Sequence, residues 1–203
     1  MSQTVKPAVM MYTEQTPNPE SLKYVTNRMI YQGTADFKTA EVAAEWSPLA
    51  NALFAMPYVK GVYISNNFVT VSKELNYQWE DIMLPLKAFI KEYLESGNEI
   101  ISEGYAEAQA ELEAVSGNSF NYSEADSEIV NKIRELIETY VKPAVEMDGG
   151  NIEFKHFQDG IVTVILQGSC SGCPSSTVTL KSGIEGMLKR MVPEVREVVS
   201  EMG

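Results

Sequence analysis

The stretch from Asn151 to Pro174 reads NIEFKHFQDGIVTVILQGSCSGCP. Two runs rich in apolar and β-branched residues flank Asp159-Gly160, a pair typical of type I′ turns because both central residues need positive φ. The pattern predicts a β-hairpin with strands over about 151–157 and 161–167. The glycine- and cysteine-containing loop that follows leads to Pro174, a residue suited to the first turn of a helix.

The sequence on both sides of this hairpin predicts one helix before it and one after it. Apolar residues recur at helical spacing over 128–141, and Pro143 is expected to end that helix. A second apolar stripe runs through Leu180, Ile184 and Leu188, and a last strand is expected over 195–199. Residues 127–203 therefore read as a small α+β domain.

Residues 1–95 read as a second α+β domain, with four strands and two helices. Short strands are expected at 22–25 and 29–31, and a hairpin at 59–64 and 68–72. Ser47-Pro48 is an N-cap followed by a first-turn proline, and it opens one helix. The other helix spans 79–94, with Pro85 expected to kink or restart it. Since this part of the chain contains no Cys or His, we expect a recognition or stabilising domain.

The net charge of −12 is concentrated between these two domains. Residues 92–126 contain 9 acidic and no basic side chains, and the segment is rich in Ala, Ser, Gly and Asn. Such a composition buries too little apolar surface to fold alone, so 96–126 is expected to be an acidic, flexible linker. The acidic balance argues against nucleic-acid binding, and no apolar run is long enough for a membrane span. A cytoplasmic protein is expected.

Cys170 and Cys173, the chain's only cysteines, carry the chemistry. They lie in a strand-to-helix loop, where the helix N-terminus is expected to favour thiolates. A zinc site or a 4Fe–4S cluster needs four thiolates or equivalents, and one chain supplies two. The simplest completion is a homodimer that contributes both cysteines from each chain. The single His156 shares strand parity with Ile152 and is expected to be a packing residue rather than a ligand.

Two other uses of the CxxC motif stay open at this point. A thiol–disulfide oxidoreductase would use Cys170 and Cys173 as attacking and resolving thiols, although no basic residue lies in the loop. A zinc-bridged structural dimer would use the same ligands without any transfer function.

At this level of detail the chain resembles a known family. Three C-terminal motifs carry the likeness to the NifU-like domain of Nfu proteins: Tyr140-Val141-Lys142-Pro143, Asp148-Gly149-Gly150-Asn151 and Gly168-Ser169-Cys170-Ser171-Gly172-Cys173-Pro174. Residues 1–95 resemble the Nfu N-terminal domain through Gln15-Thr16-Pro17-Asn18-Pro19, Ser47-Pro48-Leu49-Ala50 and Phe68-Val69-Thr70-Val71.

The resemblance implies a non-enzymatic carrier that binds a 4Fe–4S cluster at a homodimer interface and delivers it to apo-proteins. It implies that Cys170 and Cys173 are the cluster ligands, and that an upstream donor supplies the cluster. The acidic middle segment has no counterpart in the resemblance.

Overall fold

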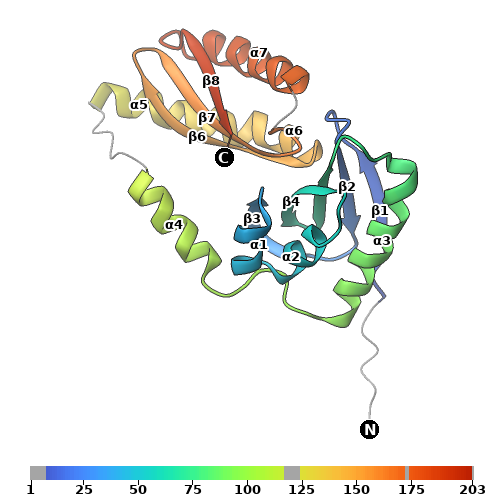
Figure 1. Ribbon diagram of the computed structural model, residues 1–203. Helices are drawn as coiled ribbons and strands as arrows, with labels where there is room; N and C mark the ends of the chain where they lie inside the picture. The colour runs from blue at the N-terminus through green and yellow to red at the C-terminus, as the bar shows by residue number, and fades with distance from the viewer. Residues whose placement is uncertain (1–7, 117–123, 172–173, 203) are drawn as a thin grey trace. The chain divides into compact units, whose positions relative to one another are not determined.

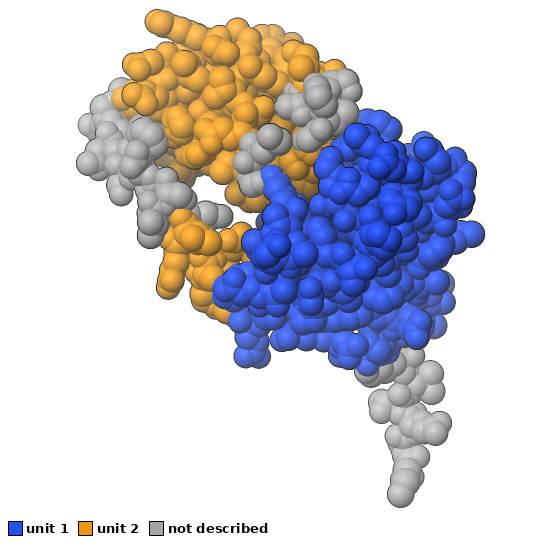
Figure 2. Space-filling view, in the orientation of Figure 1, with its two compact units in different colours: residues 1–103 blue, residues 104–203 orange. Residues whose placement is uncertain are grey.

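The computed structural model describes residues 8–116, 124–171 and 174–202 (Figure 1). The chain forms two compact units, residues 1–103 and 104–203 (Figure 2). Each unit combines helices with a β-sheet, so the predicted α+β class with two domains is confirmed. Within the described residues, no helix has both the length and the apolarity to cross a lipid bilayer.

The first unit is a five-stranded antiparallel sheet with three helices. Its strand order is β1-β2-β5-β4-β3, which leaves β1 and β3 at the edges. The strands are β1 (Met11–Gln15), β2 (Ser21–Thr26), β3 (Tyr31–Phe37), β4 (Val59–Asn66) and β5 (Phe68–Lys73), and the helices are α1 (Ala40–Trp46), α2 (Pro48–Phe54) and α3 (Trp79–Ser96).

Two elements of this unit were not expected from the sequence. Strand β1 mixes polar and apolar residues over only five positions, and α1 buries a single residue, Ala43, so neither has a clear apolar period. The strand expected at 29–31 is displaced, because β3 begins at Tyr31. The expected helix at 79–94 is α3, which continues through Pro85 as one helix.

Ser47 joins three segments of the first unit. Its hydroxyl accepts a hydrogen bond from the Ala50 N–H (3.0 Å), as the N-cap of α2, and donates to the carbonyl oxygen of Ile100 (2.6 Å). The Ser102 N–H also donates to the carbonyl oxygen of Trp46 (2.8 Å). The chain after α3 thus returns to the first unit before helix α4 (Tyr105–Ser116) begins. The linker over 96–126 remains a prediction, and 117–123 lie outside the described residues.

The second unit packs helices against one face of a three-stranded sheet of order β6-β7-β8. Its elements are α5 (Glu124–Leu136), a π-helical turn η1 (Ile137–Val141), α6 (Lys142–Met147), β6 (Gly150–Gln158), β7 (Ile161–Gly168), α7 (Pro174–Met191) and β8 (Glu197–Met202). Strands β6 and β7 are antiparallel, whereas β8 runs parallel to β7. Alternate residues of β7, among them Val164 and Leu166, share one core with Ile133 of α5 and Ile184 of α7.

The helical segment does not end at Pro143 as the sequence predicts. The chain widens into the π turn η1, where the Lys142 N–H donates to the carbonyl oxygen of Ile137, five residues back. Pro143 then lies in the first turn of α6, where a missing N–H costs little. The π turn thereby lets the chain remain helical up to Met147.

The expected β6–β7 hairpin is confirmed, with one change of face. Asp159 (φ 51°) and Gly160 (φ 81°) both adopt the positive φ that the turn requires. The register shifts between Phe154 and His156, and His156 then pairs with Thr163. Because one extra residue reverses the alternation of a strand, His156 lies on the face opposite Ile152, not on the same face as predicted.

Candidate functional site

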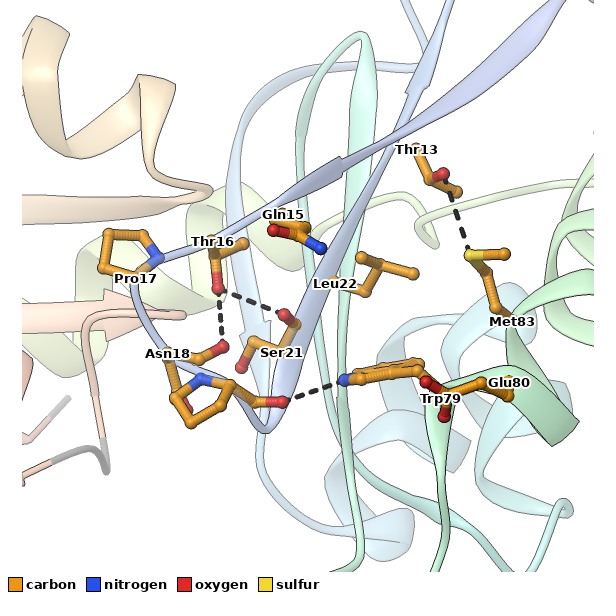
Figure 3. Close-up of a pocket in the computed structure, with 11 residues that line it drawn as sticks. Thr13, Gln15, Thr16, Pro17, Asn18, Ser21, Leu22, Trp79, Glu80 and Met83 are labelled. Atoms are coloured by element: carbon orange, nitrogen blue, oxygen red, sulfur yellow. Dashed lines mark hydrogen bonds between the residues drawn. The ribbon is translucent and has the colours of Figure 1, made fainter.

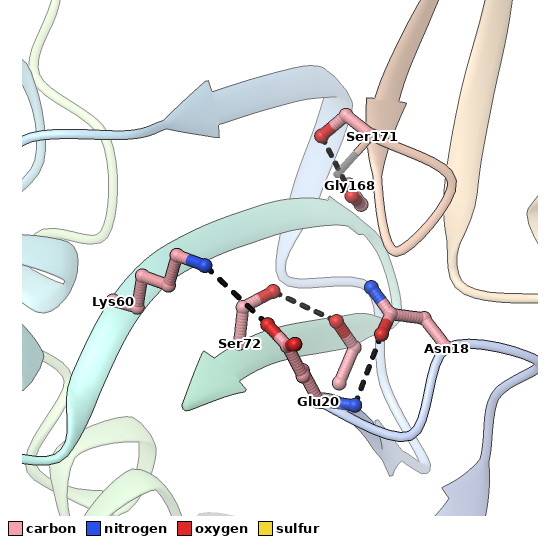
Figure 4. A network of polar contacts seen from close by, with 7 residues as sticks. Asn18, Glu20, Lys60, Ser72, Gly168 and Ser171 are labelled. Atoms are coloured by element: carbon pink, nitrogen blue, oxygen red, sulfur yellow. Dashed lines mark hydrogen bonds and ion pairs between the residues drawn. The ribbon is translucent and has the colours of Figure 1, made fainter. Parts of the chain in front are cut away.

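The cysteine loop begins where β7 ends. Gly168 adopts φ 65°, a left-handed conformation that turns the chain out of the strand. Its carbonyl oxygen accepts hydrogen bonds from both the N–H (3.1 Å) and the hydroxyl (2.9 Å) of Ser171 (Figure 4). These local bonds fold residues 168–171 into a tight turn that carries Cys170.

Cys170 packs against the backbone of Gly150, the first residue of β6. A Cβ atom on Gly150 would lie 2.5 Å from the carbonyl oxygen of Gln167 and 3.0 Å from Cys170 Sγ. Only glycine allows this approach, and it leaves the Cys170 side chain 6% exposed. The glycine pair of the Asp148-Gly149-Gly150-Asn151 motif therefore shapes the cysteine site from the neighbouring strand.

Ser169 fastens the cysteine loop to the turn before β6. Its hydroxyl donates to the carbonyl oxygen of Asp148, and its N–H donates to that of Gly149 (3.3 Å). Ser169 Oγ also lies 3.8 Å from Cys170 Sγ. Two glycine-rich turns that are about twenty residues apart in sequence are thus joined around the thiol.

The surroundings of Cys170 favour the neutral thiol in this conformation. Burial raises the pKa of Cys170 to about 11, the hydrogen bond with Ser169 lowers it in part, and the negative charge of Asp148 raises it further. The sequence predicts a lowered pKa from the helix N-terminus. That prediction is wrong for Cys170, because burial is the largest influence on its pKa and Cys170 lies four positions before α7.

Asn151 connects the two strands next to the cysteine loop and was missed as a site residue. Its amide donates to the carboxylate of Glu153 and to the side-chain oxygen of Gln167, both at 2.9 Å. Asn151 is 1% exposed, and its bond to Gln167 holds β6 to β7 directly beside Gly150, whereas its bond to Glu153 stays within β6. A polar residue after a glycine pair at a strand start was the available signal in the sequence.

His156 lies away from the cysteine loop, in the bulged part of β6. Its Nε2 is 3.1 Å from the hydroxyl of Thr163 on β7. This contact is consistent with the packing role expected for the chain's single histidine.

Cys173, the second predicted ligand, lies outside the described residues. Within the described part of the chain, no three His, Cys, Asp or Glu side chains gather into a group that could hold a metal ion. The joint role of Cys170 and Cys173 as ligands remains a prediction from the sequence.

Comparisons with known proteins match both units. Residues 11–97 match the family described as "Scaffold protein Nfu/NifU N terminal", and residues 133–199 match the family described as "NifU-like domain". A human relative, "NFU1 iron-sulfur cluster scaffold homolog, mitochondrial", is 40% identical over 196 residues, covering 96% of this chain and 72% of the human protein.

Two further relatives are also similar over nearly the whole length of this chain. A Drosophila virilis protein of the same name is 39% identical over 98% of this chain, and "NifU-like protein 5, mitochondrial" of Arabidopsis thaliana is 39% identical over 95% of it. This chain spans 63% of the fly protein and 68% of the Arabidopsis protein.

The predicted cytoplasmic location is contradicted by these comparisons. The human, fly and Arabidopsis relatives are all named as mitochondrial proteins. Composition could not make this distinction, because the core and the thiol loop of a folded domain have the same physical requirements in either compartment.

Proposed function

Because this chain belongs to the Nfu family of iron–sulfur cluster scaffold proteins, we propose that it binds a 4Fe–4S cluster and passes it to apo-proteins. Cys170 and Cys173 of two chains supply the four thiolate ligands, so the loaded form is a homodimer. The cluster is cargo rather than a resident cofactor, and the protein is not an enzyme. The names of the relatives support a mitochondrial setting.

One observation carries this proposal: the fit of the Cys170 loop against Gly150. The backbone of β6 lies where a side chain would otherwise displace Cys170 Sγ, so two motifs that are far apart in sequence are built around one thiol. An iron–sulfur cluster needs thiolates on a chain segment that can approach it closely. Gly168, with its left-handed φ, and Gly150, with no side chain to block the thiol, let the Cys170 loop make such an approach once it opens.

Loading requires the cysteine loop to open. Cys170 is 6% exposed here, and a ligand shared between two chains must reach the surface. Among the described residues, the bonds that hold the loop closed include those from Ser169 to the turn at Asp148 and Gly149. Iron binding then replaces the thiol proton, because the thiolate is the ligand form.

Transfer is an exchange of ligands without a net redox change. Incoming thiolates of a client displace the thiolates of Cys170 and Cys173 on the cluster iron, and the released cysteines take up protons. The cluster leaves with its iron and sulfide content unchanged. An upstream donor reloads the emptied dimer by the same exchange in reverse.

A thiol–disulfide oxidoreductase is the less favoured alternative. Such an enzyme attacks with a thiolate, and its attacking cysteine has a lowered pKa. Burial instead raises the pKa of Cys170 to about 11. A zinc-bridged structural dimer would use the same ligands, and metal analysis separates it from a cluster carrier.

The test is anaerobic reconstitution with iron and sulfide, followed by iron, sulfide and zinc analysis and by mass measurement in solution. We expect about four iron and four sulfide per dimer, with dimerisation only on loading. Cys170→Ala and Cys173→Ala should abolish cluster binding, whereas the control His156→Gln should retain it. A stoichiometric cluster in either cysteine variant, or its loss in the histidine variant, contradicts the ligand assignment. Insulin reduction by the iron-free monomer would support the oxidoreductase.

A further inference from the structure

The outer edge of β1 in the first unit presents unpaired backbone groups. The Asn27 N–H donates to the carbonyl oxygen of Met10 (3.1 Å), so Met10 faces β2. The alternation of an antiparallel strand then turns Thr13 and Gln15 away from β2. Within the described residues, the backbone N–H groups of Thr13 and Gln15 have no hydrogen-bond partner.

A cavity of about 610 Å³ lies beside this edge (Figure 3). Thr13 and Gln15 of β1 form one wall, and Trp79, Glu80 and Met83 at the start of α3 form the other. The loop that joins β1 to β2 closes one end of the cavity.

Two contacts fix the walls of the cavity. The Trp79 indole N–H donates to the carbonyl oxygen of Pro19 (2.9 Å), and the Thr13 hydroxyl donates to Met83 Sδ (3.9 Å) (Figure 3). The indole is thereby oriented, with Lys73 Nζ 5.9 Å from its ring centroid, and the indole and the thioether both offer apolar surface to a side chain that enters from the edge.

Glu80 gives the cavity its charge. It is exposed, and within the described part of the chain it forms no ion pair. Glu14, which also lies on β1, is already paired with Lys23 (3.3 Å). Glu80 is thus the carboxylate left available to a cation at this edge.

Strand β1 has little protection as a sheet edge beyond its short length and the charge of Glu14, which is paired with Lys23. Natural edge strands carry lysine, proline or a bulge that discourages pairing with another chain. Met11–Gln15 contains neither lysine nor proline and pairs with β2 without a register shift. Met10 and Tyr12 are 67% and 55% exposed, so apolar surface accompanies the unpaired edge.

From these observations we propose that β1 is a docking edge for an extended segment of a partner protein. The segment pairs with the outward backbone groups of Thr13 and Gln15 and adds a sixth strand to the sheet. It places one apolar side chain in the cavity against Trp79 and Met83, and a lysine or arginine against Glu80. Because strand residues two positions apart share a face, the segment carries an apolar and a basic residue separated by one residue.

This inference deepens the proposed carrier function, since it locates the recognition of a client or donor on the first unit. The probe is a library of seven-residue peptides in which the central residue is threonine and the other six positions are randomised. The library is screened against the iron-free full-length protein. We expect enrichment of peptides with an apolar residue two positions from a lysine or arginine.

Two variants test the enriched peptide. Thr13→Pro removes one outward N–H and leaves the β1–β2 hydrogen bonds in place, since proline is tolerated on a strand edge that faces solvent. Its affinity for the peptide should fall about tenfold relative to Thr13→Val, which loses only the hydroxyl contact with Met83. Glu80→Lys should reduce affinity for basic peptides to a similar extent. Glu92→Lys makes the same charge change elsewhere on α3, at an exposed position, and should leave affinity unchanged.

The proposal is overturned if no peptide is enriched, or if a folded Glu80→Lys variant binds the enriched peptide as tightly as the wild type. Iron-free dimerisation that Thr13→Pro abolishes would assign the edge to a second copy and would also overturn it. Cys170→Ala should bind the peptide normally. Failure of the peptide experiment therefore leaves the cluster proposal intact, and failure of cluster binding leaves the docking edge intact.

Discussion

Gly150 and Gly183 differ in what surrounds the position of the missing Cβ atom. At Gly150 that atom would lie 2.5 Å from a carbonyl oxygen, whereas at Gly183 in α7 nothing lies within 4 Å. We expect Gly150→Ala to lower the free energy of unfolding by about 1–3 kcal/mol through overpacking. Gly183→Ala should raise it by about 0.5–1 kcal/mol, because alanine favours the helix. Urea unfolding of both variants measures the two values.

The same pair of variants relates stability to ligand binding. The added methyl group of Gly150→Ala displaces Cys170 Sγ, so its iron content after reconstitution should fall together with its stability. Gly183→Ala should load normally. Equal stability of Gly150→Ala and wild type would show that the backbone near Cys170 can move away at little cost.

The buried thiol of Cys170 predicts a pH dependence of stability. Burial raises the pKa of Cys170 to about 11 in the folded protein, whereas a thiol in an unfolded chain titrates near pH ~8.5. The unfolded state therefore loses its proton first as the pH rises, and the folded state is disfavoured between about pH 8.5 and 11. The stabilising contribution of the buried thiol is present in full below that pH range.

Wild type and Cys170→Ala should therefore respond differently to alkali. Between pH 8 and 11 the wild type should lose about 2–3 kcal/mol more than the variant, as measured by urea unfolding of the iron-free proteins. Taking the difference removes the titration of lysines and tyrosines that both proteins share. Parallel curves for the two proteins would show that Cys170 is accessible to solvent.

At the scale of elements, two prolines should act in opposite directions. Pro85 is exposed inside α3, where it removes a helix hydrogen bond, and Pro48 lies in the first turn of α2, where none is lost. Pro85→Ala should raise the free energy of unfolding by about 1–3 kcal/mol. Pro48→Ala should lower it by about 0.4–1 kcal/mol. Thermal and urea unfolding check both, and a loss of stability in Pro85→Ala would mean that the helix needs its bend for packing.

The elements that the sequence predicts correctly are those whose signal is local. Asp159-Gly160 determines its hairpin alone, because positive φ at both residues leaves few other conformations. The bulge before His156 and the π turn at Ile137–Val141 were not predicted. Both insert one residue into a regular period, and only contacts elsewhere in the fold decide where that residue goes.

In the candidate site, too, the residues with a local signal were predicted and those that depend on distant contacts were not. Cys170 and Cys173 are recognisable from type and spacing alone, since two thiols in a glycine-rich loop have few uses. The contacts of Gly150 and Ser169 join segments about twenty residues apart, so no local pattern reports them. The burial of Cys170, and with it the direction of its pKa, follows from those contacts and was therefore predicted wrongly.

At the scale of the whole molecule, Ser47 ties the last residues of the first unit to the start of α2. Its hydroxyl holds the carbonyl group of Ile100 as well as the start of α2. We expect Ser47→Ala to cost about 1–3 kcal/mol and to release residues 97–103. Limited proteolysis should then cleave the chain between the units faster than in the wild type.

Thr39→Ala is the matched control for this experiment. Thr39 caps α1, since its side chain accepts a hydrogen bond from the Val42 N–H (3.4 Å). Within the described part of the chain, this hydrogen bond does not involve the segment after α3. Its variant should lose some stability while the cleavage between units stays at the wild-type rate. Equal acceleration by both variants would attribute the cleavage to general loosening of the first unit.

The π turn at Ile137–Val141 has a consequence for how this chain tolerates changes in length. A π turn holds one residue more than an α-helical turn, so deleting Thr139 would allow an uninterrupted α-helix. Each residue of an α-helix advances the chain by about 100° around the axis, and the wide turn absorbs that step without turning α6. Deleting Thr139 should therefore leave Asp148 and Gly150 beside Cys170. Inserting a second extra residue, with no further wide turn to absorb it, would rotate α6 and move both residues away from Cys170, so this segment tolerates a change in length in one direction only.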